Sequence, residues 1–140
     1  PAARADCSPA VREALAARSG REVAWCKDVA TVEGGGALSV ARFESRKGEE
    51  LVTLAYAAPG ETIFLDYPGN ADPSGTWRDD DGGEFSLDAY RPLFAFRTAD
   101  GLELAVRWTG AEGEAMDLFR QDGDRFVPFV AASWYRMAEE

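Results

Sequence analysis

The C-terminal third of the chain, from Phe94 to Phe129, contains two stretches that each read as a β-hairpin. In each stretch two apolar-rich segments flank a short polar turn, Ala99-Asp100-Gly101 in the first and Gln121-Asp122-Gly123-Asp124 in the second. Asp-Gly between alternating segments is a strong hairpin signal, because glycine accepts the positive φ that a tight turn demands. Two consecutive hairpins predict an antiparallel meander, one face of which must be covered.

One helix is predicted, over residues 8–20. Ser8 suits the N-cap and Pro9 the first helical position, and Gly20 stands where a left-handed C-cap belongs. The apolar residues of this segment form a narrow stripe that would lie on a sheet. We expect the stripe to contain Val11, Ala14 and Leu15, and the helix to turn Arg12 and Arg18 toward solvent.

Short strands separated by turn residues account for most of the remaining chain. After a tail over 1–7, strands are predicted at 21–31, 37–45, 51–57 and 62–67, and residues 84–137 hold a short strand at 84–90, the meander and a last strand or helix at 131–137. In the first of these strands Val23 and Trp25 should alternate with Ala24 and Cys26. We predict one mainly β domain over 1–140, an antiparallel sheet built as a sandwich, a barrel or a bent meander.

The two cysteines, Cys7 and Cys26, flank the predicted helix. An even pair in a small chain fits one disulfide, which would tether the helix to the strand that follows it. Closing such a loop contributes about 3 kcal/mol in the chain-entropy model. The alternative is a pair of buried free thiols. A metal site made of two cysteines alone is disfavoured, because zinc normally takes four ligands.

A disulfide implies an oxidising compartment. The start, Pro1 to Asp6, is short, small and polar, and we interpret it as a mature N-terminus that remains after removal of a signal peptide. No stretch approaches 18 apolar residues, so no membrane-spanning helix is predicted. The expected location is therefore periplasmic or secreted.

The formal net charge is -10, from 25 acidic and 15 basic residues. Such a surface repels nucleic-acid phosphates. It suits a basic partner, a cation, or solubility alone.

Residues 68–83 are dominated by turn formers and are predicted to form a long loop. Loops of this length are often functional. The acidic run could bind calcium through Asp79, Asp81 and Glu84, but its consecutive carboxylates lack the alternate spacing of an EF-hand, and a solvated loop explains them as well. No metal or other cofactor is therefore predicted, with calcium kept as an alternative.

Aromatic residues accompany this acidic run. Trp77 lies among the turn residues, where it either anchors a partner or folds back over the open end of the sheet. Aromatic side chains supply contact area and carboxylates supply steering toward arginine and lysine. The predicted partner-binding set therefore contains Tyr67, Trp77, Asp79, Asp80, Asp81, Glu84 and Tyr90.

The chain contains no histidine. Its absence removes Ser-His-Asp and Cys-His catalysis and histidine-ligated zinc or iron. No nucleophile elbow, phosphate-binding loop or dinucleotide-binding fingerprint is present. We predict no enzymatic activity and no catalytic residue. A hydrolase that uses two carboxylates stays open as an alternative, since a glycosidase needs no other catalytic groups.

In size, disulfide, acidity and β-richness the chain resembles small exported bacterial inhibitors, namely periplasmic lysozyme inhibitors and immunity proteins. This likeness involves no specific residues. It implies a non-enzymatic binding protein that neutralises a basic cell-wall hydrolase or toxin by inserting an acidic, aromatic loop. The alternative is a structural or small-ligand-carrying β-barrel of the envelope.

Overall fold

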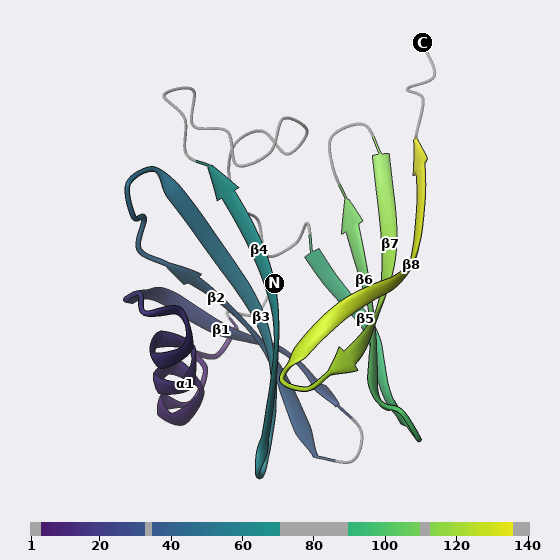
Figure 1. Cartoon of the computed structure of the whole chain (residues 1–140), viewed down its shortest axis with the longest axis horizontal. Helices are drawn as coiled ribbons and strands as arrows, with labels where there is room; N and C mark the ends of the chain where they lie inside the picture. The colour runs from purple at the N-terminus through teal and green to yellow at the C-terminus, as the bar shows by residue number, and fades with distance from the viewer. Residues whose placement is uncertain (1–3, 33–34, 71–89, 110–112, 136–140) are drawn as a thin grey trace. The chain divides into compact units, whose positions relative to one another are not determined.

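The computed structural model describes residues 4–32, 35–70, 90–109 and 113–135. These residues form one helix and eight strands (Figure 1). The elements are α1 (Pro9–Ser19), β1 (Val23–Val32), β2 (Gly36–Phe43), β3 (Glu49–Ala58), β4 (Glu61–Asn70), β5 (Tyr90–Thr98), β6 (Gly101–Thr109), β7 (Gly113–Asp122) and β8 (Arg125–Tyr135). The predicted mainly β class with one short N-terminal helix is confirmed. In this described part, no helix has the length and apolar character needed to cross a membrane.

The chain divides into two compact units, which are described one at a time. The first comprises residues 1–69 and 123–125, and the second comprises residues 70–122 and 126–140. The hydrogen-bonded strand order is β1-β2-β3-β4 in the first unit and β8-β7-β6-β5 in the second. The ladders β1–β2, β2–β3, β5–β6 and β6–β7 are antiparallel, as predicted.

Residues 123–125 belong with the first unit, in which they contact β4. The Phe64 N–H donates to the carbonyl oxygen of Asp124 at 2.8 Å, and Phe64 pairs with Arg125 in the parallel sense. This short parallel bridge departs from the otherwise antiparallel pairing.

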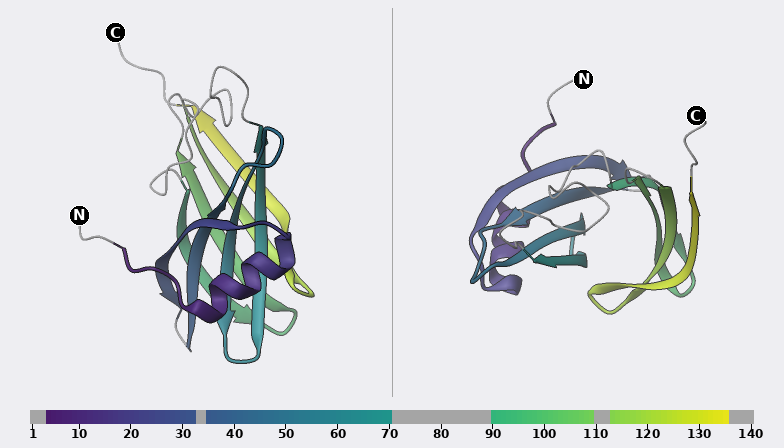
Figure 2. Two further views of the ribbon diagram at one scale, coloured as in Figure 1. Left: turned by 90° about the vertical axis from the view of Figure 1, so that its left-hand side faces the viewer. Right: turned by 90° about the horizontal axis from the view of Figure 1, so that it is seen from above.

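Helix α1 begins and ends as its sequence predicts. Ser8 is the N-cap, and its hydroxyl accepts a hydrogen bond from the Val11 N–H at 3.3 Å. Gly20 adopts the left-handed conformation (φ 65°), and its N–H donates to Ala16. The helix lies across one face of β1–β4 (Figure 1 and Figure 2, left), and Leu15 is buried at 1% exposure. The apolar stripe therefore packs on a sheet, as expected.

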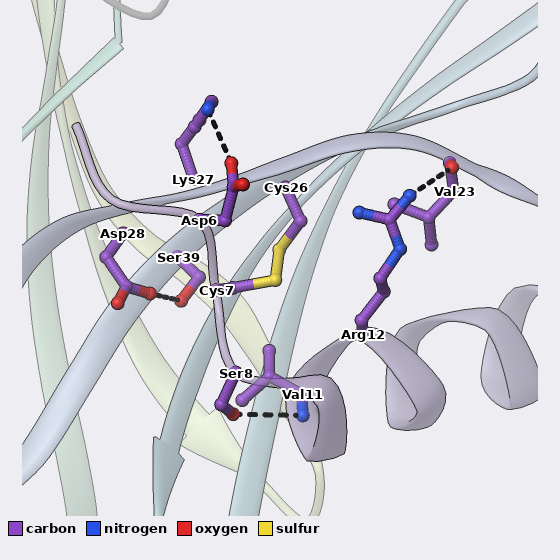
Figure 3. The surroundings of a disulfide bond; sticks show 10 residues. All are labelled: Asp6, Cys7, Ser8, Val11, Arg12, Val23, Cys26, Lys27, Asp28 and Ser39. Atoms are coloured by element: carbon purple, nitrogen blue, oxygen red, sulfur yellow. Dashed lines mark hydrogen bonds and ion pairs between the residues drawn. A yellow bond between two sulfur atoms is a disulfide. The ribbon is translucent and has the colours of Figure 1, made fainter. Parts of the chain in front are cut away.

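The disulfide between Cys7 and Cys26 is present and ties the N-terminal segment to β1 (Figure 3). Hydrogen bonds reinforce this tie: the Cys7 N–H donates to the Cys26 carbonyl, and the Asp28 N–H donates to the Ala5 carbonyl at 2.8 Å. Asp6 also forms an ion pair with Lys27. Residues 5–7 thus run along β1 and occupy its outer edge.

Two bulges in β1 overturn its predicted alternation. Val23 pairs with Phe43 and Trp25 with Arg42, so Ala24 is an extra residue between them; a second register shift follows Asp28. A bulge adds one residue and changes which side chains share a face. Val23 and Cys26 are consequently both buried in the core beneath α1, although simple alternation placed them on opposite faces.

The sheet of the first unit is buried on both faces. Toward α1 it presents Ala41, Phe43, Ala55 and Phe64 together with Leu15 and the disulfide. The neighbours of these residues along β2, β3 and β4 point the other way and are also buried: Leu38, Val40, Val52, Leu54, Ile63 and Leu65. Strands buried on both faces read as nearly continuous apolar runs, and β2 and β3 follow this pattern.

Both predicted hairpin turns lie where the sequence placed them. Thr98 pairs with Gly101, so Ala99 and Asp100 form the first turn and Gly101 (φ 122°) already opens β6. In the second hairpin Gly123 (φ 63°) lies between β7 and β8. The Leu102 N–H donates to the side-chain carbonyl of Gln121 at 2.9 Å, which ties the first turn to the end of β7.

Two predicted segments differ from the structure, and a third cannot be compared with it. Strand β4 continues through Asn70, so residues 68–70 are strand where the loop over 68–83 was expected to begin. Residues 131–135 are the end of β8, not a separate strand or helix. Residues 71–83, and the part of the predicted 84–90 strand that precedes Tyr90, lie outside the described residues.

Candidate interaction surfaces

The first surface to consider is the C-terminal end of α1, where Arg18 does not face solvent as expected. Its guanidinium forms two parallel hydrogen bonds to Asp66 on β4, at 2.8 and 3.0 Å. Its carbon Cζ also lies 4.4 Å from the centre of the Phe64 ring. The hydroxyl of Thr53 donates to the same carboxylate at 2.7 Å. The contacts of Arg18 with Asp66 and Phe64 anchor the helix to β4, and the Thr53 hydrogen bond holds Asp66 in place from β3. This arrangement is structural.

The pKa of Asp66 reflects that anchoring. Burial is the largest single influence and acts to raise the pKa, but the hydrogen bonds from Arg18 and Thr53 and the charges of Arg18 and Arg125 outweigh it. The pKa of Asp66 therefore lies below its usual range. A carboxylate held ionised and fully paired in this way does not act as a general acid at neutral pH.

In the second unit one sheet face is buried and the other is partly exposed. Leu102, Leu104, Val106 and Phe119 point to the buried face. On the other face three phenylalanines are largely exposed: Phe94 at 49%, Phe96 at 45% and Phe129 at 41%. Single exposed apolar residues are ordinary on protein surfaces, but a cluster of large ones marks an interaction site.

Strand register explains why these phenylalanines share a face with charged residues. Phe96 pairs with Glu103, which in turn pairs with Arg120. Residues opposite one another in a ladder project from the same side of the sheet. Arg120 forms an ion pair with Glu103 at 3.2 Å and lies over the Phe129 ring at 4.6 Å. We call Phe94, Phe96, Phe129, Arg120 and Glu103 the aromatic face.

The aromatic face is held in a defined arrangement. The rings of Phe94 and Phe96 stack with centroids 5.8 Å apart, a separation at which aromatic pairs attract. A second ion pair, between Arg107 and the buried Glu114, lies further along the same side of β6 and β7. Two ion pairs thus accompany the phenylalanine rings on this side of the second unit.

A third feature is a groove of about 340 Å³ in the first unit, beside the start of α1. Small or short side chains form its walls, among them Ala37, Ala57 and Pro59. Its polar groups are those of Ser8, Asp28, Ser39 and Thr62. The buried hydroxyl of Ser39 donates to the carboxylate of Asp28 at 2.6 Å (Figure 3).

The structure describes little of the predicted partner-binding set. Trp77, Asp79, Asp80, Asp81 and Glu84 lie outside the described residues, and with them the calcium alternative. Tyr67 is on β4, half-buried, in the first unit, while Tyr90 opens β5 in the second. This binding set therefore stays a prediction. Within the described residues, no three histidine, cysteine, aspartate or glutamate side chains converge as metal ligands would.

Sequence reasoning missed both the aromatic face and the groove. The Phe94-Ala95-Phe96 alternation does show that the two rings share a face, but apolar alternation alone favours burying that face. The groove depends on where α1 begins relative to β2 and β3, which alternation does not encode. The small residues on these strands, among them Ala37 and Ala57, are the sequence signal that could have indicated a groove.

No protein-family model matches the chain, and neither curated proteins nor solved structures gave a match.

Proposed function

We propose that this chain is an exported, non-enzymatic binding protein that neutralises a basic cell-wall hydrolase or toxin. The observation that carries the proposal is the aromatic face: three exposed phenylalanines on one side of the second unit, with an arginine packed over one ring. Phenylalanine and arginine are enriched at protein interfaces. Such residues act as anchors when a partner excludes water from them.

The distribution of charge supports a basic partner. Residues 71–89 contain six acidic residues and one basic residue, a net charge of -5 and half of the chain's total of -10. The described part of the second unit contains five acidic and four basic residues. The acidic excess is therefore concentrated in the segment that immediately precedes β5, the strand bearing Phe94 and Phe96. Electrostatic steering acts mainly on association, while the apolar contact holds the complex.

The disulfide supports the proposed location, because such bonds persist in oxidising compartments such as the periplasm. The absence of histidine from the sequence supports a non-enzymatic role. A small inhibitor needs a rigid scaffold and an exposed contact surface, and it needs no catalytic group.

The proposal is tested by titrating the purified protein into basic peptidoglycan hydrolases, including a muramidase, an amidase and an endopeptidase. Calorimetry measures binding, and clearing of a cell-wall suspension measures inhibition. We expect stoichiometric inhibition of at least one enzyme, with affinity that falls as salt rises because charges are screened. Failure to bind any of them at low salt would overturn the proposal.

A paired substitution locates the contact. The Phe94→Ser/Phe96→Ser variant should bind at least about tenfold more weakly, because hot-spot aromatics each contribute more than 1.4 kcal/mol. The Phe94→Leu/Phe96→Leu variant keeps the apolar area and should lose less affinity. Equal affinity of the serine variant and the wild type would exclude the aromatic face as the contact.

A further inference from the structure

The groove beside α1 combines apolar walls with a carboxylate whose single side-chain partner among the described residues is a neutral hydroxyl. Asp28 accepts a hydrogen bond from Ser39, and Ser39 itself is 1% exposed. None of the described residues that line the groove is a lysine or an arginine. Lys27, the neighbour of Asp28 along β1, forms its ion pair with Asp6. Among the described residues that line the groove, no cationic side chain therefore balances the negative charge of Asp28.

We propose that this groove binds the side chain of a lysine from the basic partner, an inference that rests on the proposed function. A lysine side chain has an apolar stem and a compact ammonium head with three donors. The stem would pack on Ala37, Ala57 and Pro59, as lysine stems do on apolar surfaces. The head would donate to Asp28, with the hydroxyls of Thr62 and Ser8 as further acceptors lining the same groove.

The start of α1 is poorly suited to bind an anion here. Helix N-termini attract anions through free backbone N–H groups. Pro9 has no N–H, and the N–H of Val11 already donates to Ser8. Two of the first three helical residues therefore offer no free N–H, and the Asp28 carboxylate lies in the groove, so a cation is the better electrostatic match.

The size of the groove is consistent with this occupant. A volume of about 340 Å³ is at the lower end of the range for small-molecule sites, roughly 300–1,000 Å³. The groove opens to solvent beside the exposed residues Ser8, Ala10 and Pro59. A side chain attached to a partner's backbone can enter such an open groove without requiring a lid.

The experiment uses the full chain and two model compounds, N-acetyl-lysine methylamide and N-acetyl-norleucine methylamide. They share the aliphatic stem, and only the first has the ammonium. Amide chemical shifts are followed by NMR during titration. We expect saturable shifts at Ala37, Ser39 and Thr62 with the lysine compound, and none with the norleucine compound. Non-saturating shifts, or equal shifts with both compounds, would overturn the proposal.

Two variants and a control sharpen the test. Asp28→Asn keeps the side-chain shape and should weaken lysine binding at least about tenfold, the difference expected for losing a charge-assisted hydrogen bond. Ala57→Leu fills the groove while keeping the carboxylate, and should abolish binding. Asp100→Asn removes the same charge from an exposed turn of the second unit and should bind as the wild type does. Circular dichroism checks folding, and if Asp28→Asn is unfolded, Ala57→Leu decides.

Further arms separate this inference from the proposed function and from other sources of the ammonium group. The Phe94→Ser/Phe96→Ser variant should bind the lysine compound normally, since its substitutions lie in the other unit. Absence of lysine binding by the wild type therefore contradicts the groove alone. Failure to bind basic hydrolases contradicts the proposed function and the source of the lysine, but not the affinity of the groove for a lysine side chain. Tighter binding of 1,5-diaminopentane than of the lysine compound would assign the groove to a free diamine and overturn the proposal as stated.

Discussion

The two units differ in how far the two faces of their β-strands are buried. In the first, a helix and a disulfide cover one face, and the opposite face is buried as well. In the second, Leu102, Leu104 and Val106 fill the buried face, while Phe94, Phe96 and Phe129 remain exposed on the other. In the first unit the large apolar residues are buried and stabilise the fold. The second leaves some of its largest ones available, and this contrast separates a scaffold from a contact surface.

The outermost strands of the two units, β1 and β5, show the same contrast. Residues 5–7 pair with the outer edge of β1 and are fixed there by the disulfide. Strand β5 is last in its order, and it contains Pro92 and a register shift around Leu93. Proline and bulges discourage further strand pairing at an edge. Binding through the aromatic face of the second unit is therefore expected to use side chains more than added strands.

The largest expected effect tests whether apolar residues serve different roles in the two units. Leu15→Ala should lower the free energy of unfolding by about 2–5 kcal/mol, because it leaves a cavity beneath α1. Phe96→Ala should lower it by less than about 1 kcal/mol, because the ring is half exposed. Chemical denaturation measures both. Similar losses for the two variants would show that the aromatic face is part of the core.

The disulfide should rank next. Replacing both Cys7 and Cys26 by serine should lower the free energy of unfolding by about 3 kcal/mol, because the unfolded chain gains the entropy of an open loop. Wild-type protein treated with reductant is the matched control and should show the same loss. An unchanged denaturation midpoint in the double variant would show that the disulfide does not stabilise the first unit.

A close approach in the first unit gives a smaller effect. A Cβ added to Gly36 would clash with the ring of Tyr56, so Gly36→Ala should destabilise the protein by roughly 1–3 kcal/mol through overpacking. Combining it with Tyr56→Leu removes the obstructing ring atoms. The two changes should then be non-additive, with the double variant less destabilised than the sum. Strict additivity would contradict this packing.

The smallest effect is on how the stability of the protein changes at acidic pH, through Asp66 beneath α1. Because the pKa of Asp66 is lowered by folding, its contribution is present above the unfolded-state value of about 3.9 and is lost as pH falls through the lower folded-state value. Asp66→Asn should therefore be less stable than the wild type at neutral pH, and the gap should narrow below about pH 4. Thermal unfolding over this range measures it. A gap that is constant with pH would argue against the Arg18–Asp66 pair.

The sequence could predict the parts of this fold that local chemistry specifies. Ser8, Pro9 and Gly20 determine the ends of α1, the Asp-Gly turns determine two hairpins, and two cysteines on either side of a helix determine a disulfide. The capping and turn signals act over a few neighbouring residues, and two cysteines allow only one intramolecular disulfide.

The rest depends on contacts between distant segments. The bulge at Ala24 changes which residues of β1 share a face, and alternation cannot reveal an inserted residue. Arg18 looked like a solvated residue because its partner, Asp66, is 48 positions away. The exposure of Phe94 and Phe96 follows from cross-strand register and from which face of the meander is buried, and neither is written in the local pattern.

Hydroxyl-radical footprinting of the complex with a basic cell-wall hydrolase tests the exposed-face assignment most directly, because it labels accessible phenylalanine rings in the unaltered protein. In the free protein Phe94, Phe96 and Phe129 should be oxidised readily, while the buried Phe43 should not. In the complex the three exposed rings should become protected, and residues of the first unit remote from the groove should not change. Equal labelling of all three rings with and without the bound hydrolase would contradict the assignment of the aromatic face as the contact surface.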